Sequence, residues 1–331
     1  MYIVNSYFLA VVLCVITMLC WGSWANTQKL AQKSWRFELF YWDYVLGILL
    51  MSLFFSFTLG STGELGRSFL PDIGQAEIGN IWNALLGGII FNAANILIAA
   101  AISIAGMSVA FPVGIGIALV LGVVVNFVAS PQGNAFWLFS GVVVITIAII
   151  LDAVAYRRKA NQAQKVPTKG IVLSVVGGIL MALFYRFVAS SMATNFEQPE
   201  SGMLTPYTAI FIFSAGILLS NFIFNTILMK KPFEGLPVSY SQYFKGSLRE
   251  HITGILGGII WSIGMTFSII AAGKAGFAIS YGLGQGATLV AALWGVFIWK
   301  EFKDSKNTTG LLGTMFVLFF VGIGLIILAG I

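Results

Sequence analysis

The stretch NIWNALLGGIIFNAANILIAAAIS, residues 80–103, contains no charged side chain. A helix of roughly 20 residues crosses a hydrocarbon core about 30 Å thick, so this stretch is long enough to span a bilayer. Its apolar residues run on without a break instead of alternating with polar ones, which favours a helix over a membrane-spanning strand. These residues therefore predict a transmembrane helix.

Similar apolar stretches recur along the whole 331-residue chain, in which 58% of residues are hydrophobic and only 9% are charged. The mean hydropathy is +0.93. The connections between the stretches are too short to hold a separate soluble domain. The sequence predicts an all-α integral membrane protein of ten transmembrane helices, at approximately 5–26, 39–60, 80–103, 107–129, 134–156, 170–193, 204–228, 252–273, 276–299 and 309–330.

Basic residues gather in alternate connections: of the 18 Lys and Arg residues, all but Arg67, Arg186 and Lys274 follow odd-numbered spans. Such residues stay on the cytoplasmic side during insertion, so we expect both termini outside, in the plasma (inner) membrane. Charges spread over four loops without an aromatic platform argue against nucleic acid as a partner, and the lipid bilayer is the expected one. These loop residues are Lys29, Lys33, Arg36, Arg157, Arg158, Lys159, Lys165, Lys169, Lys230, Lys231, Lys245, Arg249, Lys300, Lys303 and Lys306.

An internal repeat is visible in the third span: LGGII at residues 86–90 recurs at 256–260, a displacement of 170 residues. The match continues without a gap as far as 116 and 286, and GILL at 47–50 recurs at 216–219. Glycine and leucine pairs also recur by chance in apolar sequences, but the near-constant displacement favours duplication. A five-helix unit has an odd number of spans, so its second copy must cross the membrane in the opposite sense. We therefore expect a 5+5 inverted repeat, with halves at 1–156 and 170–331 joined by a short cytoplasmic linker at 157–169, which is typical of secondary transporters.

Three short motifs then carry a resemblance to a known family: WGSW at 21–24, YWDY at 41–44, and the Gly pair at 87–88 followed by Asn92 and Asn95. In these positions the chain resembles the ureide permeases. More broadly, it is similar to the glucose/ribose and rhamnose porters of the drug/metabolite transporter superfamily. The resemblance covers essentially all ten spans. It implies a 5+5 inverted-repeat fold and uptake of neutral polar solutes, often coupled to protons.

One departure from the family concerns the centre of the chain. Plant ureide permeases carry a long central cytoplasmic loop with a phosphate-loop-like motif, whereas residues 157–169 are short and lack a Gly-rich cradle. Nucleotide control is therefore not carried over, and we expect no cofactor. The departure leaves the substrate open between a sugar and a ureide or nucleobase-like compound.

Polar side chains near the middle of a span are costly and are therefore candidates for function. Amides and hydroxyls suit a neutral solute, and aromatic faces can stack on a sugar or a flat heterocycle. Asn92 and Asn95, three positions apart, share one helix face, but they could also merely cross-link helices. Arg186 could meet a carboxylate-bearing substrate or extend its head outward. The predicted substrate-binding residues are Asn92, Asn95, Trp261, Ser262, Tyr281, Gln285 and Arg186.

Asp43 is the one acid clearly inside an apolar span, which makes it the proton-coupling candidate. It lies near the predicted cytoplasmic edge, where a plain ion pair with Lys29 or Lys33 is the alternative. His251, the one histidine, is expected in a solvated connection. No metal site is expected.

Aromatic residues cluster at the same edge, where they could form a gate or an ordinary interfacial belt. They are Trp21, Trp24, Tyr41 and Trp42.

Scattered acids and one loop histidine do not supply the clustered groups that catalysis needs, so an enzyme is not expected. The sequence therefore predicts a secondary active transporter that imports a small neutral polar solute by proton symport with alternating access. An uncoupled facilitator of the same solutes and an exporter of drugs or amino acids remain the alternatives.

Overall fold

The computed structural model describes residues 1–31, 35–159, 167–233, 235–303, 305 and 308–331. Three of the basic residues used to orient the chain, Lys33, Lys165 and Lys306, lie outside the described residues, as does most of the predicted linker at 157–169.

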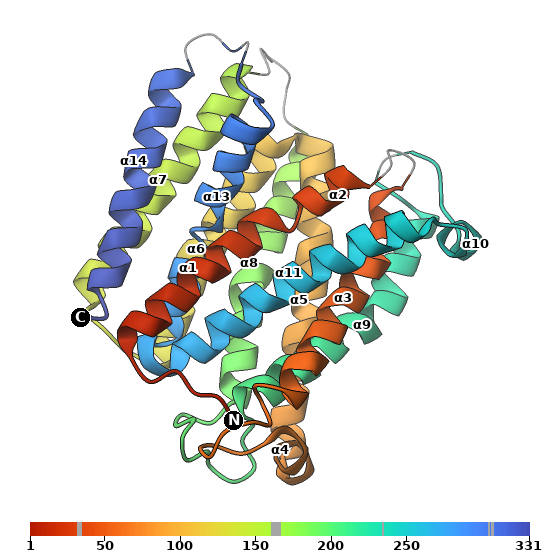
Figure 1. Ribbon diagram of the computed structural model, residues 1–331. Helices are drawn as coiled ribbons and strands as arrows, with labels where there is room; N and C mark the ends of the chain where they lie inside the picture. Colours follow the sequence, from red (N-terminus) through yellow and green to blue (C-terminus); the bar gives the residue numbers. More distant parts are fainter. Residues whose placement is uncertain (32–34, 160–166, 234, 304, 306–307) are drawn as a thin grey trace.

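Helices account for most of the described structure (Figure 1). In chain order they are α1 (Tyr7–Ser23), α2 (Asn26–Leu30), α3 (Phe37–Phe57), α4 (Phe69–Gln75), α5 (Ile78–Ala105), α6 (Met107–Ala129), α7 (Ala135–Lys159), α8 (Thr168–Ser191), α9 (Pro206–Lys230), α10 (Tyr240–Phe244), α11 (Leu248–Ala275), α12 (Phe277–Gly284), α13 (Ala287–Leu293), the π-helical η1 (Trp294–Ile298) and α14 (Thr309–Leu328).

Among the described residues, 9 helical segments are long and apolar enough to cross a membrane, and α1 is a shorter apolar helix. This confirms the prediction of an all-α membrane protein with about ten spans. The segments alternate in direction, and Figure 1 shows both termini at the end of the bundle that carries α4, with α2 and α10 toward the other end.

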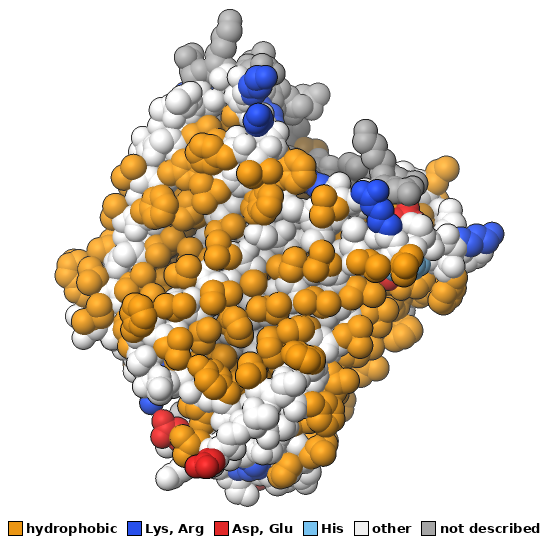
Figure 2. Space-filling view, in the orientation of Figure 1, with side chains coloured by type: hydrophobic (Ala, Val, Ile, Leu, Met, Phe, Trp, Pro, Cys, Tyr) orange, Lys and Arg blue, Asp and Glu red, His pale blue; other side chains and the backbone are white. Residues whose placement is uncertain are grey.

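The outer surface of the bundle is apolar, as expected where helices face lipid. Figure 2 shows a broad hydrophobic band between the two ends, with basic side chains mainly at the end that carries α2 and α10. Large side chains such as Phe8, Phe54, Phe222 and Phe320 are more than half exposed. The protein is therefore a multi-pass integral membrane protein.

The predicted ninth span, 276–299, is not one continuous α-helix. It is divided into α12, α13 and η1, with Gln285 and Gly286 at the break. Glycines at 282, 284 and 286 explain the break, because glycine weakens a helix by about 1 kcal/mol relative to alanine. Apolar composition predicted the span but not this interruption.

Tight turns join α5 to α6 and α11 to α12. Gly106 and Gly276 make these turns with φ of +78° and +82°, a conformation that residues with a Cβ rarely adopt. Each turn reverses the chain between two helices without an intervening loop, so α5–α6 and α11–α12 form helical hairpins.

Two pairs of helices approach so closely that their backbones touch. In the α3–α11 pair, a Cβ added at Gly258 would overlap the carbonyl oxygen of Tyr44. In the α5–α9 pair, a Cβ added at Gly88 would overlap the carbonyl oxygen of Phe213. Without a hydrophobic drive between helices in lipid, such close contact is a main source of helix association.

Each end of the bundle is held by ionic contacts between distant segments. At the α4 end, the fully buried Asp72 pairs with Arg67 at 3.0 Å and accepts from Thr205 at 2.8 and 2.9 Å. At the α2 end, Glu301 pairs with Lys29 at 3.3 Å and with Lys159 at 3.7 Å. The Asp72–Thr205 bonds and the Lys29–Glu301 pair join the first half of the chain to the second.

Candidate solute-binding cavity

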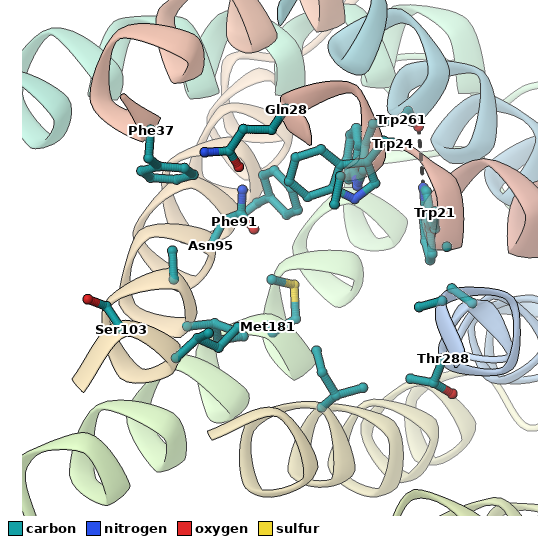
Figure 3. Close-up of a pocket in the computed structure, with 18 of the residues that line it drawn as sticks. Trp21, Trp24, Gln28, Phe37, Phe91, Asn95, Ser103, Met181, Trp261 and Thr288 are labelled. Atoms are coloured by element: carbon teal, nitrogen blue, oxygen red, sulfur yellow. Dashed lines mark hydrogen bonds between the residues drawn. The ribbon is translucent and has the colours of Figure 1, made fainter. Parts of the chain in front are cut away.

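A cavity of about 630 Å³ lies within the bundle, and α1, α2, α5, α6, α8, α11 and α13 all contribute to its walls. Figure 3 draws 18 of the residues that line it and labels ten of them. Its lining reaches Arg36, Glu38 at the start of α3, and Phe233 just after α9, so its mouth lies toward the α2 end of the bundle. A space of this size holds a small organic molecule.

One wall of the cavity is aromatic. The rings of Trp21 and Trp261 are stacked with centroids 5.9 Å apart and planes 14° from parallel. The indole N–H of Trp21 donates to the Trp261 carbonyl oxygen at 3.3 Å, which fixes the first ring. Phe91 lies 4.4 Å from Trp261 between centroids. These fixed rings give a flat solute or a sugar a surface on which to stack.

The polar groups of the cavity are mostly uncharged. They include the side chains of Gln28, Asn95, Ser103, Gln285 and Thr288. Amides and hydroxyls supply both donors and acceptors without a fixed charge. The cavity interior is therefore suited to a neutral molecule that carries several hydrogen-bonding groups.

Two charges lie at the mouth of the cavity, and they are paired with each other. Arg36 Nη2 is 2.5 Å from Glu38 Oε1, and Arg36 Nε donates to Glu38 Oε2 at 3.2 Å. Arg36 also donates to the carbonyl oxygen of Leu236. Because the guanidinium and the carboxylate neutralise each other, the mouth carries no net charge from this pair.

The two predicted asparagines of α5 lie on either side of one tyrosine. Tyr41 donates its hydroxyl hydrogen to Asn92 Oδ1 at 2.8 Å, and Asn95 Nδ2 donates to the Tyr41 oxygen at 3.1 Å. Asn95 lines the cavity, whereas Asn92 is fully buried behind it and also bonds α9 through Ser220 at 2.9 Å. Asn92 thus lies where it cross-links α5 to α3 and α9, which is the alternative to substrate binding that the sequence analysis left open.

The other predicted binding residues are divided between the cavity and the packing around it. Trp261 and Gln285 line the cavity. Ser262 is buried and donates to the Ile48 carbonyl oxygen at 3.2 Å, and Tyr281 is buried and donates to that of Ala118 at 3.1 Å. Arg186 is half-buried and outside the cavity lining, without an ion pair to any described acid.

The four predicted gate residues are divided in the same way. Trp21 and Trp24 line the cavity. Tyr41 is fully buried between the two asparagines, and Trp42 is buried with its indole nitrogen 3.2 Å from Met229 Sδ. Only the two tryptophans of the 21–24 motif are therefore placed to touch a solute.

Asp43 does not line the cavity; it lies beside it in a separate polar cluster. Its carboxylate accepts from the Tyr243 hydroxyl at 2.7 Å and lies 2.9 Å from His251 Nδ1. The expectation that His251 is solvated in a connection was wrong, because α11 already begins at Leu248 and the half-buried ring contacts the carboxylate of Asp43. Of the two lysines expected as partners of Asp43, Lys29 pairs with Glu301 instead and Lys33 lies outside the described residues.

Several lining residues were not predicted, chief among them Gln28, Phe91, Met181 and Thr288. Phe91 and Met181 are apolar and indistinguishable by type from lipid-facing residues. Gln28 lies in α2, a five-residue helix outside the predicted spans. Its place in the sequence therefore gave no indication that its side chain lines the cavity. No group of three or more His, Cys, Asp or Glu side chains that could hold a metal occurs in the described part of the chain.

Comparison with known proteins identifies the family. The sequence profile described as "Ureide permease" matches residues 40–169 and 155–329. The chain belongs to the ureide permease family. The expected resemblance is thereby confirmed, and the two matched segments meet at the connection between α7 and α8.

Individual relatives agree with this membership. Ureide permease 2 of Arabidopsis thaliana is 24% identical and aligns over 94% of both chains, and Ureide permease 1 of the same plant is 24% identical over 98% of both. A probable glucose uptake protein, GlcU, of Staphylococcus aureus is 36% identical over 28% of this ureide permease family member and 29% of its own length. These relatives are named as permeases and an uptake protein, so this family member is a transporter and not an enzyme.

A solved structure supports the fold. One crystal structure of a protein superposes with a TM-score of 0.62 over 96% of this chain and 95% of its own, at 14% identity. At that identity the likeness concerns the fold alone.

Proposed function

We propose that this ureide permease family member imports a small neutral polar solute, either a sugar or a ureide or nucleobase-like compound. The observation that carries the proposal is the cavity in which a stacked Trp21–Trp261 wall faces uncharged amides. An aromatic wall recognises a flat ring or the face of a sugar, and the amides pair with its N–H, O–H and C=O groups.

The charge balance of the cavity favours a neutral solute over a charged one. Arg36 and Glu38 are bonded to each other at the mouth, so a charged solute would have to break this pair or enter without a counter-ion. Leaving a buried charge unpaired is strongly unfavourable. The names of the relatives, ureide permeases and a glucose uptake protein, fit the two neutral classes.

Proton symport is the second part of the proposal, and the cluster around Asp43 supports it. A buried carboxyl next to the imidazole of His251 can take up and release a proton while its surroundings compensate the charge. The alternatives are an uncoupled facilitator of the same solutes and an exporter of drugs or amino acids. Accumulation against a gradient separates the importer from both.

Alternating access is the third part, and the unequal ends of the bundle support it. The cavity mouth lies toward the α2 end. Toward the other end, buried hydroxyls join the helices: Tyr185 lies 3.0 Å from Ser268 Oγ, which lies 3.2 Å from Ser280 Oγ. A carrier that is open at one end and closed by breakable contacts at the other is expected to switch between the two.

We also propose that the halves 1–156 and 170–331 are inverted repeats, because matched positions make matched contacts. Gly258 packs on Tyr44 and Gly88 packs on Phe213, and both positions of each contact correspond within the 169- or 170-residue displacement. Ser262 bonds the Ile48 carbonyl oxygen, and Asn92 bonds that of Ile217 at 3.3 Å. Exchanging the halves thus converts one set of contacts into the other.

The proposed function predicts uptake of at least one of three labelled solutes: allantoin as a cyclic ureide, uracil and glucose. In cells or proteoliposomes with a proton gradient, the wild-type chain is expected to accumulate that solute. Gln285→Ala should weaken its binding by about 1–3 kcal/mol, or roughly 5- to more than 100-fold, because a buried hydrogen-bond partner is lost.

The matched control for that experiment is Gln198→Ala, since Gln198 is an exposed glutamine far outside the cavity lining. It should leave uptake unchanged. Preference for a lipophilic cation, or export of the solute against its gradient, would reject the proposed import of a neutral solute.

We propose that both termini lie outside the cell. This orientation predicts one-sided labelling by a membrane-impermeant thiol reagent. Cysteine at the exposed Glu64, in the connection before α4, should react in intact cells. Cysteine at the exposed Lys231, just after α9, should react only after the membrane is opened. The unsubstituted chain, whose Cys14 and Cys20 lie in α1, is the control. The reverse pattern would place the termini in the cytoplasm.

A further inference from the structure

A chain of hydrogen bonds leads from the backbone of α9 to the cavity, and its first member fixes the direction of the rest. The carbonyl oxygen of Ile217 can only accept, so the Asn92 atom 3.3 Å from it must be the amide nitrogen. The same nitrogen lies 2.9 Å from Ser220 Oγ. Ser220 has one hydroxyl hydrogen, which it donates to the carbonyl oxygen of Gly216 at 2.8 Å or of Ile217 at 3.0 Å, so its oxygen accepts from Asn92.

With its nitrogen directed to α9, Asn92 presents its oxygen to Tyr41. That oxygen can only accept, so the single hydroxyl hydrogen of Tyr41 is committed to it at 2.8 Å. Both residues are fully buried, so water cannot replace either partner.

Because Tyr41 donates its hydroxyl hydrogen to Asn92, it determines the orientation of the Asn95 side-chain amide. Because Tyr41 has no second hydrogen to give, its oxygen can bond Asn95 only by accepting from Nδ2, at 3.1 Å. Asn95 is half-buried and lines the cavity (Figure 3). Its Oδ1 is therefore left for the cavity as a hydrogen-bond acceptor, whereas the flipped amide would offer only N–H donors there.

We infer that Tyr41 is a positioning residue that holds Asn95 Oδ1 toward the cavity, and that the transporter thereby selects solutes with an N–H or O–H donor at that point. The inference rests on the proposed function of the cavity. A solute in which this donor is methylated would leave the Asn95 oxygen without a partner, and a buried unpaired acceptor is costly. Selectivity would thus be set by a residue that never touches the solute.

The chain provides a matched control for Tyr41 in the same helix. Tyr44 is also fully buried in α3, and its hydroxyl has no hydrogen-bond partner among the described residues. Changing either tyrosine to phenylalanine keeps the ring and removes one oxygen atom. Only Tyr41→Phe frees the Asn95 amide to rotate.

The test measures uptake of whichever of labelled allantoin, uracil and glucose the wild type accumulates, in competition with a series of its singly N- or O-methylated analogues. We expect the wild type to reject at least one analogue by about 10-fold or more relative to the parent. In Tyr41→Phe this discrimination should shrink at least 5-fold, through a higher KM for the parent with little change in maximal rate. Tyr44→Phe should discriminate as the wild type does.

A second variant acts on the same chain of bonds without changing Tyr41. Asn92→Leu removes the acceptor that holds the Tyr41 hydrogen, so Tyr41 can donate to Asn95 instead and the amide can flip. It should also reduce discrimination, and it keeps the inference testable if Tyr41→Phe does not fold. Size-exclusion profiles and thermal unfolding verify the folding of every variant.

The outcomes separate this inference from the proposed function. If both Tyr41→Phe and Asn92→Leu discriminate as the wild type does while Asn95→Ala does not, Tyr41 has no positioning role and the transport proposal stands. Equal loss of discrimination in Tyr44→Phe would also overturn the inference, because that change leaves the chain of bonds intact. Absence of uptake of all three solutes by the wild type would reject the proposed function and, with it, the inference.

Discussion

Asp43→Asn is expected to abolish accumulation of solute against its gradient while leaving exchange of solute across the membrane partly intact. The Asp43 carboxylate is buried and holds Tyr243 and His251 at 2.7 and 2.9 Å. Asparagine has the same shape and can still accept from Tyr243, but it cannot take up or release a proton. The carrier should therefore still move solute, but without coupling, so that the internal concentration only equals the external one.

The measurement compares accumulation and counterflow of the labelled solute in proteoliposomes with an imposed proton gradient. Glu64→Gln makes the same carboxylate-to-amide change at an exposed position outside the spans and should accumulate solute as the wild type does. Accumulation by Asp43→Asn at the wild-type level would remove Asp43 from the coupling mechanism and favour its purely structural role beside His251.

The spans could be predicted because the rule behind them is simple. Backbone groups in lipid must be paired within the segment, so a long apolar run has few alternatives to a helix. Composition could not predict the break between α12 and α13, because glycine is tolerated both inside membrane helices and at interruptions. Which of the two occurs depends on neighbouring helices.

The candidate site was predicted in part, and the residues on α5 show why. Helical spacing placed Asn92 and Asn95 on one face, and the structure does bring them to the same tyrosine. Spacing along one helix could not determine that a partner helix covers Asn92 and leaves Asn95 at the cavity. That division depends on α3 and α9, which are far away in the sequence.

Two residues near the edge of the bundle were misjudged from sequence position for a similar reason. Tyr41 was expected near the cytoplasmic surface, in a gate or an interfacial belt, yet it is fully buried. His251 was expected in solvent, yet it bonds Asp43 at 2.9 Å. Both expectations took distance along the chain from a polar loop as a measure of exposure, whereas burial here results from the packing of α3 against α11.

The second large effect is expected from the glycines at the helix crossings: Gly258→Ala and Gly88→Ala should each strongly destabilise the fold. The added Cβ would overlap the carbonyl oxygen of Tyr44 in the first case and of Phe213 in the second. A backbone oxygen cannot turn aside as a side chain can, so the two helices must separate. Overpacking of this kind costs typically ~1–3 kcal/mol, and contact with a rigid backbone places these two at or above the upper limit.

Gly313→Ala is the matched control for those variants, because a Cβ there meets nothing within 4 Å although the residue lies in a membrane helix, α14. It should be neutral or raise the unfolding temperature slightly, since alanine favours a helix by about 1 kcal/mol over glycine. Apparent unfolding temperatures in detergent measure all three variants. If Gly258→Ala unfolds at the same temperature as Gly313→Ala, the close crossing of α3 and α11 is wrong.

If instead Gly88→Ala and Gly258→Ala lower the unfolding temperature by similar amounts, two glycines 170 residues apart each allow a close helix crossing of the same kind. That equality is what duplication of one five-helix unit predicts, since each half then inherited the same glycine for the same crossing.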